Sequence, residues 1–417
     1  MTGPPPLRMV LTLLAGRAAF RGMVVLSAPL LLAAWGADVF GPYALAMGST
    51  LVLNPLVGSG TEKSAGTLVP RYRPPAADRV LGAHLVVAAA ITGCSLLLAV
   101  PFALADPDRA ELWLLAGATN VGFGAVQALV AYWRVLGQPS ADPASFGVLA
   151  IVTAGGLALA GFAGLGPQTY LALQAGTAAA VCAVLVLRLR GHIRLRRLRR
   201  RALRLVARTT VLMGTNTLLA TAPFSVVVAV LGGQWDPATV SHFYVALTVY
   251  TIAGNVLDYL QRVYQPWLTT ALRATPERVL EPTRRGARLG RAVLAPVGAL
   301  AVVTAGWTLG PVLAPLAGMV AVTPTLMMVA LVLWVRENAV TATLGATTRA
   351  GIIGLAGTAA VALLLVPPLA ATGALLALLL GAAVQLPLLA TALPADRVRA
   401  RRPARATRLP AGGGWPR

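Results

Sequence analysis

The sequence predicts an all-α integral membrane protein with about twelve transmembrane helices, arranged as two six-helix lobes related by a pseudo-two-fold axis along the membrane normal. Of its 417 residues, 57% are hydrophobic and only 12% are charged, whereas soluble domains carry roughly 25% charged residues. Apolar stretches of about 20 residues, the length that crosses a bilayer, recur along nearly the whole chain. A weak internal repeat suggests that the helices form two copies of one unit.

The hydrophobic pattern places six helices near residues 9–35, 42–60, 81–105, 112–133, 144–164 and 168–187. A second six follow near residues 209–231, 239–260, 290–309, 319–346, 350–369 and 372–393. The opening apolar run is longer than a signal-peptide core, so we expect it to remain as the first helix. These spans divide the chain into an N-terminal lobe (1–187), a basic cytoplasmic linker (188–208), a C-terminal lobe (209–394) and a basic disordered cytoplasmic tail (395–417).

The charge of +22 follows the predicted topology. With the N-terminus in the cytoplasm, the basic residues fall on the inner side, apart from Arg109 in an outer loop and three arginines within spans, Arg17, Arg21 and Arg336. This positive-inside bias supports about twelve spans with both termini cytoplasmic. The run RLRGHIRLRRLRRRALR has no interleaved aromatic residues, so we interpret it as a topology signal that contacts anionic lipid and not as a nucleic-acid site.

Neither cysteines nor histidines indicate a metal site or cofactor. The two cysteines, Cys94 and Cys182, lie inside apolar segments, which argues against a disulfide framework. The three histidines lie in separate segments without ligand spacing. The glycine-rich GIIGLAG, residues 351–357, lacks the Lys-Ser/Thr ending of a nucleotide loop, so we expect its glycines to allow close helix packing.

The internal repeat appears when the chain is shifted against itself by 201 positions. YALAMGSTLVLN then aligns with YVALTVYTIAGN, and three pairs coincide: Tyr43 with Tyr244, Thr50 with Thr251, and Asn54 with Asn255. Chance similarity between apolar helices is the alternative. The first helix of each set also carries a proline, Pro29 and Pro223; these are candidate hinges or ordinary tolerated kinks.

Arg17 and Arg21 lie four residues apart inside the first apolar run, LTLLAGRAAFRG. A charged arginine at mid-bilayer costs roughly 3 kcal/mol, and residues four apart project from one helix face. The two side chains either point into a cavity between the lobes or extend along the helix to reach the inner headgroups. The second arrangement suits Arg17 better than Arg21, because a membrane span that begins after Arg21 keeps only about 14 apolar residues, too few to cross the bilayer.

Further charges lie at the predicted membrane boundaries. Asp258 and Arg262 are four apart and can pair along a helix, and Arg336 with Glu337 is another charge pair between apolar runs. Each pair has two alternative roles, a structural salt bridge or a contact with a ligand. The segment 57–75 resembles a cytoplasmic gate or hinge, in which we expect Glu62 and Lys63 to be solvated. Arg17, Arg21, Arg262 and Arg336 could converge on a cavity that binds an anion, because guanidinium groups hold phosphate oxygens in bidentate fashion.

With these spans, the stretches LLAAWGADVFGPYALAMGSTLVLNPLVGSGTEKSAG and LWVRENAVTATLGATTRAGIIG give the chain its resemblance to the polysaccharide flippases of the multidrug/oligosaccharidyl-lipid/polysaccharide (MOP) exporter superfamily. Gly41 and Tyr43 match the glycine and short loop that open the second helix in that family, and Thr347, Thr348 and Arg349 match the turn before the eleventh.

The resemblance implies a non-enzymatic flippase for polyprenyl-pyrophosphate-linked oligosaccharides, working in polysaccharide biosynthesis by alternating access. The cationic lumen of the family would here be supplied by Arg17, Arg21, Arg262 and Arg336, with Asp258 and Glu337 as supporting ion partners. The implied partners are the lipid-linked glycan, membrane lipid, a glycan polymerase and glycosyltransferases. The chain is expected to act as a monomer without a cofactor, coupled to an ion gradient whose ion is unknown.

Two other functions compete with this one. A multidrug or cation antiporter has the same fold but normally carries lumen carboxylates, and we find no clear mid-membrane Asp or Glu in the first six predicted helices. A membrane scaffold for glycan assembly would need no transport. Lipid-linked glycosyltransferases usually carry acidic motifs or a large outer loop, and the outer loops here are short.

Overall fold

The computed structural model describes residues 7–69, 76–138, 140–190, 200–251, 257, 276–308, 310–339 and 344–391, and these residues are almost entirely helical. Within these ranges, nine helical stretches are long and apolar enough to cross a membrane. The all-α membrane fold predicted from composition is therefore confirmed. The count of twelve spans and the domain boundaries stay predictions.

The N-terminal half, residues 7–190, begins with two helices joined by a sharp corner. The helix α1 spans Leu7–Thr50, which at 1.5 Å per residue is about twice the thickness of a bilayer core. It is broken at Gly36, whose φ of 71° and ψ of 168° only glycine adopts readily. The second predicted helix thus starts at residue 37, before the expected 42, and continues through an irregular turn at 51–52 into α2, Leu53–Leu68.

The remaining helices of this half agree with the predicted spans to within a few residues. They are α3 (Ala76–Leu97), α4 (Val100–Ala105), the short 3₁₀ segment Pro107–Arg109, α5 (Ala110–Val135), α6 (Ala141–Ala163) and α7 (Pro167–Leu189). Of the spans described, α5 is the most completely buried. Its glycines allow close approach: a Cβ at Gly124 would lie 2.5 Å from the Asn54 carbonyl oxygen of α2.

In the C-terminal half, residues 200–391, several helices begin earlier than predicted. The helix α8 spans Arg200–Gln234, so the end of the expected linker is already helical. Residues 237–251 are helical, and the rest of the span predicted at 239–260 lies outside the described residues apart from residue 257. The later elements are α10 (Pro276–Leu289), a π-helical turn (Gly290–Leu294), α11 (Ala295–Thr308), α12 (Gly310–Ala339) and α13 (Leu344–Thr391).

The helix α13 contains two predicted spans in one element. It is broken at Ala370, which has φ 48° and ψ −128°, and this position separates the spans expected at 350–369 and 372–393. Glycines of the GIIGLAG motif make close contacts as expected, since a Cβ at Gly351 would lie 2.9 Å from the Leu219 side chain of α8.

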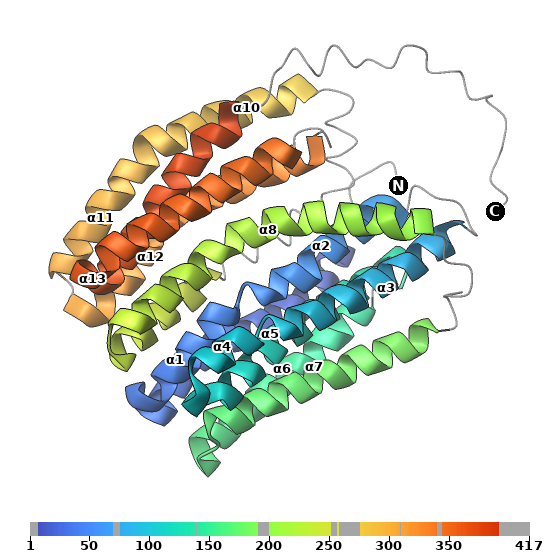
Figure 1. Ribbon diagram of the computed structural model, residues 1–417, viewed down its shortest axis with the longest axis horizontal. Helices are drawn as coiled ribbons and strands as arrows, with labels where there is room; N and C mark the ends of the chain where they lie inside the picture. The colour runs from blue at the N-terminus through green and yellow to red at the C-terminus, as the bar shows by residue number, and fades with distance from the viewer. Residues whose placement is uncertain are drawn as a thin grey trace.

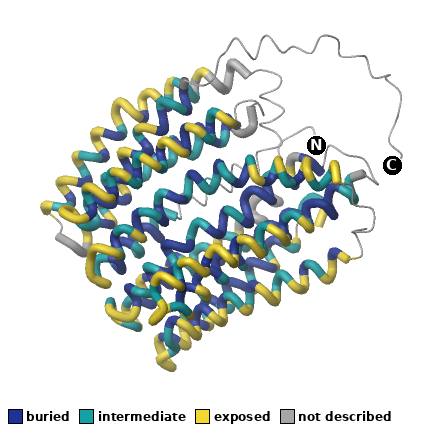
Figure 2. Tube along the Cα trace, in the orientation of Figure 1, coloured by how far each residue is buried: buried dark blue, intermediate teal, exposed yellow. Residues whose placement is uncertain are grey.

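The helix α8 is the part of the C-terminal half that contacts the N-terminal half most extensively. It packs against α2 on one side and α13 on the other, and Figure 1 shows it between the group α10–α13 and the helices α1–α7. Buried positions concentrate along the inner helices, whereas the outward faces are exposed (Figure 2). Those outward faces carry Leu104, Phe162 and Trp307, as lipid-facing surfaces should.

Two tryptophans form matching hydrogen bonds in the two halves. The indole N–H of Trp35 donates to the carbonyl oxygen of Leu165 at 2.7 Å, and that of Trp235 donates to the carbonyl oxygen of Val366 at 2.8 Å. Leu165 and Val366 are 201 positions apart, the register of the sequence repeat, and the tryptophans are 200 apart. The repeat partners Tyr43 and Tyr244 also touch, with ring centroids 6.4 Å apart. This register therefore recurs in tertiary contacts.

Candidate functional site

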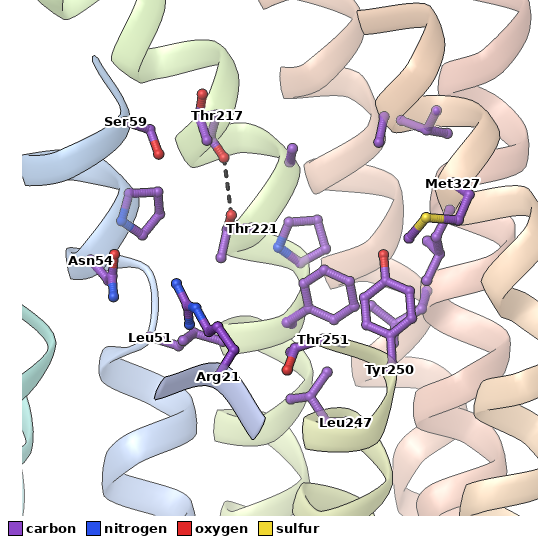
Figure 3. Close-up of a pocket in the computed structure, with 18 of the residues that line it drawn as sticks. Arg21, Leu51, Asn54, Ser59, Thr217, Thr221, Leu247, Tyr250, Thr251 and Met327 are labelled. Atoms are coloured by element: carbon purple, nitrogen blue, oxygen red, sulfur yellow. Dashed lines mark hydrogen bonds between the residues drawn. The ribbon is translucent and has the colours of Figure 1, made fainter. Parts of the chain in front are cut away.

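A cavity of about 410 Å³ lies where the two halves meet. One wall comes from α1, α2, α5 and α6, and the other from α8, residues 237–251, α12 and α13. Figure 3 shows this arrangement, with Asn54 and Ser59 of α2 facing Thr217 and Thr221 of α8. The volume falls within the range of about 300–1,000 Å³ typical of small-molecule sites.

Two arginines of α1, Arg17 and Arg21, line this cavity. Arg21 extends into it in Figure 3, and Arg17, one turn earlier, is 12% exposed. Among the described lining residues these two are the only charged ones. The sequence left open whether this helix face points to lipid or to a chamber between the lobes, and the structure places it at the chamber.

Arg17 is also part of a buried ion-pair network, which we call the inner charge network: Arg17, Glu62, Arg134 and Asp142. The Arg17 Nε and Nη2 atoms donate to the two carboxylate oxygens of Asp142 at 2.9 and 3.0 Å. Nη2 also contacts Glu62 Oε1 at 3.3 Å. Arg134 pairs with Glu62 and, through Nε at 3.3 Å, with Asp142. Four helices, α1, α2, α5 and α6, are joined by this network.

The network shows how Arg17 is accommodated within an apolar helix. Asp142 is fully buried and Glu62 is 6% exposed, and their two negative charges balance the two arginines. Buried charges persist when they are paired and hydrogen-bonded, and the Gln127 amide adds a donor to Glu62 Oε2 at 2.8 Å. Neutralisation of Arg17 therefore takes place inside the protein.

The expectation that Glu62 and Lys63 are solvated is wrong. Glu62 is buried, and Lys63 donates to the Thr217 hydroxyl of α8 at 3.0 Å. Two carboxylates, Glu62 of α2 and Asp142 of α6, lie just outside the spans expected from hydropathy, and the expectation of no mid-membrane Asp or Glu stays a prediction. The segment 57–68 is helical and packs between the halves.

The other predicted site residues differ in what the structure says of them. Arg336 is fully buried in α12 and is not among the described lining residues. Arg262 and Asp258 lie outside the described residues, as does the side chain of Glu337. Pro29 and Pro223 lie inside α1 and α8, and Pro223 lines the cavity. Their role as hinges stays a prediction.

Several lining residues were not expected at a binding site from the sequence, although Asn54 and Thr251 belong to the internal repeat. They are neutral and polar, and come from both halves: Asn54, Ser59, Gln127, Thr217, Thr221, Thr251, Thr358 and Gln385. The available signal was a glutamine or asparagine inside an otherwise apolar helix, which costs free energy in lipid unless it faces protein or a cavity. Within the described ranges, no group of three or more His, Cys, Asp or Glu side chains could hold a metal ion.

Solved structures with similar folds are membrane transporters. The chain matches the lipid II flippase MurJ in an inward closed conformation with a TM-score of 0.60 and 11% identity, over 91% of this chain and 86% of that one. It matches an inward-facing multidrug resistance MATE family transporter of the MOP superfamily with a TM-score of 0.52 and 14% identity, over 94% and 93%. It matches a point mutant of the MATE transporter VcmN of Vibrio cholerae with a TM-score of 0.53 and 14% identity, over 95% of this chain and 96% of that one.

No protein-family model and no curated protein matches the chain by sequence. At these identities the structural likenesses show the fold alone, and the chain shares the fold of these proteins. The fold implied by the resemblance drawn from the sequence is thereby confirmed.

Proposed function

We propose that this protein is a flippase that moves a polyprenyl-pyrophosphate-linked oligosaccharide from the inner to the outer leaflet of a bacterial plasma membrane, for cell-surface polysaccharide synthesis. The observation that carries the proposal is the charge of the cavity: among the described residues lining it, Arg17 and Arg21 are charged and none is acidic. Such a wall favours an anionic ligand and disfavours an organic cation.

The two arginines have different roles in this proposal. Arg17 is held in place by Asp142 and Glu62, which balance its charge, so it provides fixed N–H donors at the cavity wall and little net charge. Arg21 extends into the cavity (Figure 3) and is the primary contact for a phosphate oxygen. A guanidinium group suits this task because it keeps its charge when desolvated and offers paired donors in one plane. Arg262 and Arg336 stay candidates for further cationic contacts.

Transport would follow from rocking of the two halves around a head group bound between them. The polyprenol tail would stay in lipid, and an ion gradient, with no bound cofactor, would supply the driving force. Both termini would be cytoplasmic. Glycosyltransferases and a glycan polymerase would be the functional partners of a chain that acts as a monomer.

A multidrug or cation antiporter is the second candidate, and a specific observation supports it. The structure places two buried carboxylates, Glu62 and Asp142, next to the cavity wall, where an antiporter of cations would need them. They are, however, bound by Arg17 and Arg134. These cations compensate the carboxylates, and Arg21 adds a further positive charge to the cavity wall, so we rank the flippase first.

Reconstitution of the full chain in proteoliposomes separates the candidates. The flippase predicts that a fluorescent undecaprenyl diphosphate disaccharide moves between leaflets and that ethidium does not cross. Ethidium transport without lipid flipping would instead establish the antiporter. If neither compound moves, the membrane scaffold for glycan assembly becomes the remaining candidate and the flippase proposal is overturned.

Variants of Arg21 test the assigned contact. Arg21→Ala should lower the flipping rate by about 10- to 100-fold, the loss expected for one charged hydrogen bond, and should abolish surface glycan in cells while membrane abundance stays normal. Arg109→Ala is the matched control, because Arg109 is 52% exposed near the short 3₁₀ segment and does not line the cavity. Equal flipping by Arg21→Ala and the parent would contradict the role of Arg21.

A further inference from the structure

The wall of the cavity opposite the arginines contains a compact group of residues from α13, which we call the α13 patch: Gly354, Thr358, Gly381 and Gln385. All four line the cavity. Gly354 and Thr358 are four residues apart on the segment before the break at Ala370, and Gly381 and Gln385 are four apart on the segment after it. Each segment thus presents one glycine and one polar side chain on the same face.

The two glycines hold the two polar side chains in place. A Cβ at Gly354 would lie 3.1 Å from Gln385 Cβ and 3.2 Å from Gln385 Oε1. Gly381 packs against the Thr358 hydroxyl, and its Cβ would also lie 3.0 Å from the Gly354 carbonyl oxygen. Any larger residue at either glycine would displace the opposing side chain. Thr358 and Gln385 are accordingly 1% and 6% exposed.

The hydrogen bonds of the patch leave a donor and an acceptor for a ligand. The Thr358 hydroxyl donates to the Gly354 carbonyl at 3.0 Å, so its oxygen can still accept. The Gln385 amide nitrogen is buried without a hydrogen-bond partner among the described residues. Buried amide donors are nearly always satisfied. Since Gln385 lines the cavity, a ligand there can provide the missing acceptor.

A donor beside an acceptor matches a hydroxyl group, which both gives and receives a hydrogen bond. A phosphate oxygen at pH 7 needs donors alone, and those are found on the α1 wall. The cavity is therefore chemically asymmetric, with a cationic wall in the N-terminal half and an uncharged amide and hydroxyl wall in the C-terminal half. Of the described lining residues from the C-terminal half, none is charged.

We infer that Gln385 and Thr358 form a second subsite, which binds hydroxyl or acetamido groups of an uncharged sugar unit while Arg21 binds the phosphate of the same molecule. This inference rests on the proposed function and extends it to the kind of glycan. A sugar with a carboxylate would bury its charge against this wall without a described cation, at a large desolvation cost. The subsite thus selects neutral glycans.

The test compares binding of three probes to the purified full chain in detergent. The probes are undecaprenyl diphosphate alone, the same carrier with a neutral N-acetylated disaccharide, and the same carrier with a uronic-acid disaccharide. The parent should bind the neutral glycan about tenfold more tightly than the bare carrier, the gain expected for a hydrogen bond to a buried donor. The uronic-acid probe should gain nothing over the bare carrier.

Two substitutions isolate the patch. Gln385→Met keeps the length of the side chain without its amide, and Thr358→Val keeps its shape without its hydroxyl; each should remove the tenfold gain and leave binding of the bare carrier unchanged. Gln174→Met is the matched control. Gln174 is similarly buried in α7 and its amide nitrogen also has no partner within the described residues, but it does not line the cavity.

The outcomes separate this inference from the proposed function. If the parent binds the bare and the neutral glycan carriers equally, or if the tenfold gain survives in both Gln385→Met and Thr358→Val, the subsite is wrong and the flippase proposal stands. A parent that binds no diphosphate carrier overturns the proposed function and the subsite with it. Binding of the uronic-acid probe as tightly as the neutral one contradicts the selection of neutral glycans.

Discussion

The two halves of the molecule build the same corner with different residues. In the N-terminal half, Trp35 donates its indole N–H to Leu165, and the chain turns at Gly36 with a positive φ. In the C-terminal half, Trp235 makes the equivalent bond to Val366. The next residue there is Asp236, which caps the following helix by accepting the Thr239 N–H at 3.0 Å. The corner is common to both halves, but its local chemistry is not.

The same contrast holds for the cavity, where it acquires a functional meaning. The N-terminal half places arginines and a buried charge network at the cavity wall, whereas the described lining residues of the C-terminal half are uncharged and contribute hydroxyls and the Gln385 amide. A repeated fold whose two halves line the cavity with different residues can bind a ligand that has two chemically different parts. The comparison therefore separates residues that stabilise the fold from residues that contact a ligand, and variants can test the two sets separately.

The largest expected effect is on the charge network of the N-terminal half. Asp142→Ala should lower the free energy of unfolding by about 3 kcal/mol, because it leaves the buried Arg17 and Arg134 with fewer counter-charges. Chemical denaturation of the purified protein in detergent measures this change.

The control for Asp142→Ala is an ion pair of the same kind that is exposed in the C-terminal half. Glu281 lies 3.1 Å from Arg285 on α10, but the side chains are 50% and 77% exposed. Glu281→Ala should cost no more than about 0.5 kcal/mol. A similar loss in both variants would mean that the buried network is no more important than a surface pair.

The sequence was informative about the fold because hydropathy is a local property. Spans such as those near residues 112–133 and 168–187 were found within a few residues of α5 and α7. The beginning of α8 was placed too late because its first turns are rich in arginine and look like a polar linker. The break between the first two spans was predicted at residues 36–41, and the structure places it at Gly36; the second helix begins earlier than predicted because one glycine within an apolar run changes the average hydropathy very little.

The site was less predictable because its key contacts are not local. Arg17 was recognised as unusual, but its partners Glu62 and Asp142 are 45 and 125 residues away in the sequence. Glu62 and Asp142 lie next to polar stretches of the sequence, so the sequence predicts that their side chains are exposed to solvent. The pairing becomes visible only when α1, α2 and α6 are packed together. For the same reason, Gln385 could not be assigned to a wall of the cavity.

The next largest effect concerns the contact between the halves. A Cβ at Gly60 of α2 would lie 2.6 Å from the Thr210 carbonyl oxygen and 2.7 Å from Gly214 Cα of α8, backbone atoms that cannot rotate away. Gly60→Ala should therefore cost about 2 kcal/mol of unfolding free energy through overpacking. Gly66→Ala in the same helix meets nothing within 4 Å and should be neutral or stabilising. Equal stability of both variants would show that the halves do not meet at Gly60.

A smaller effect tests whether the two tryptophan contacts are equivalent. Trp35→Phe and Trp235→Phe each remove one indole hydrogen bond to a backbone carbonyl and retain an aromatic ring. Each should cost about 1 kcal/mol, measured by the same denaturation. A loss confined to one variant would mean that only one half depends on this contact.

The smallest effect belongs to the corner of the C-terminal half and has a pH signature. Hydrogen bonds from the Thr239 side chain and backbone hold the pKa of Asp236 below its ordinary value of 3.8. A lowered carboxyl pKa stabilises the fold above the unfolded pKa, and this contribution is lost as the pH falls through the folded pKa. Asp236→Ala should thus cost at most about 0.5 kcal/mol at pH 7, since the group is exposed. The difference between parent and variant should shrink when thermal unfolding is followed from pH 5 down to acid. In the N-terminal corner the residue after the tryptophan is Gly36, which has no carboxyl group. If the stability of Asp236→Ala depends on pH as strongly as that of the parent, the dependence comes from other carboxylates and the Asp236 cap contributes nothing.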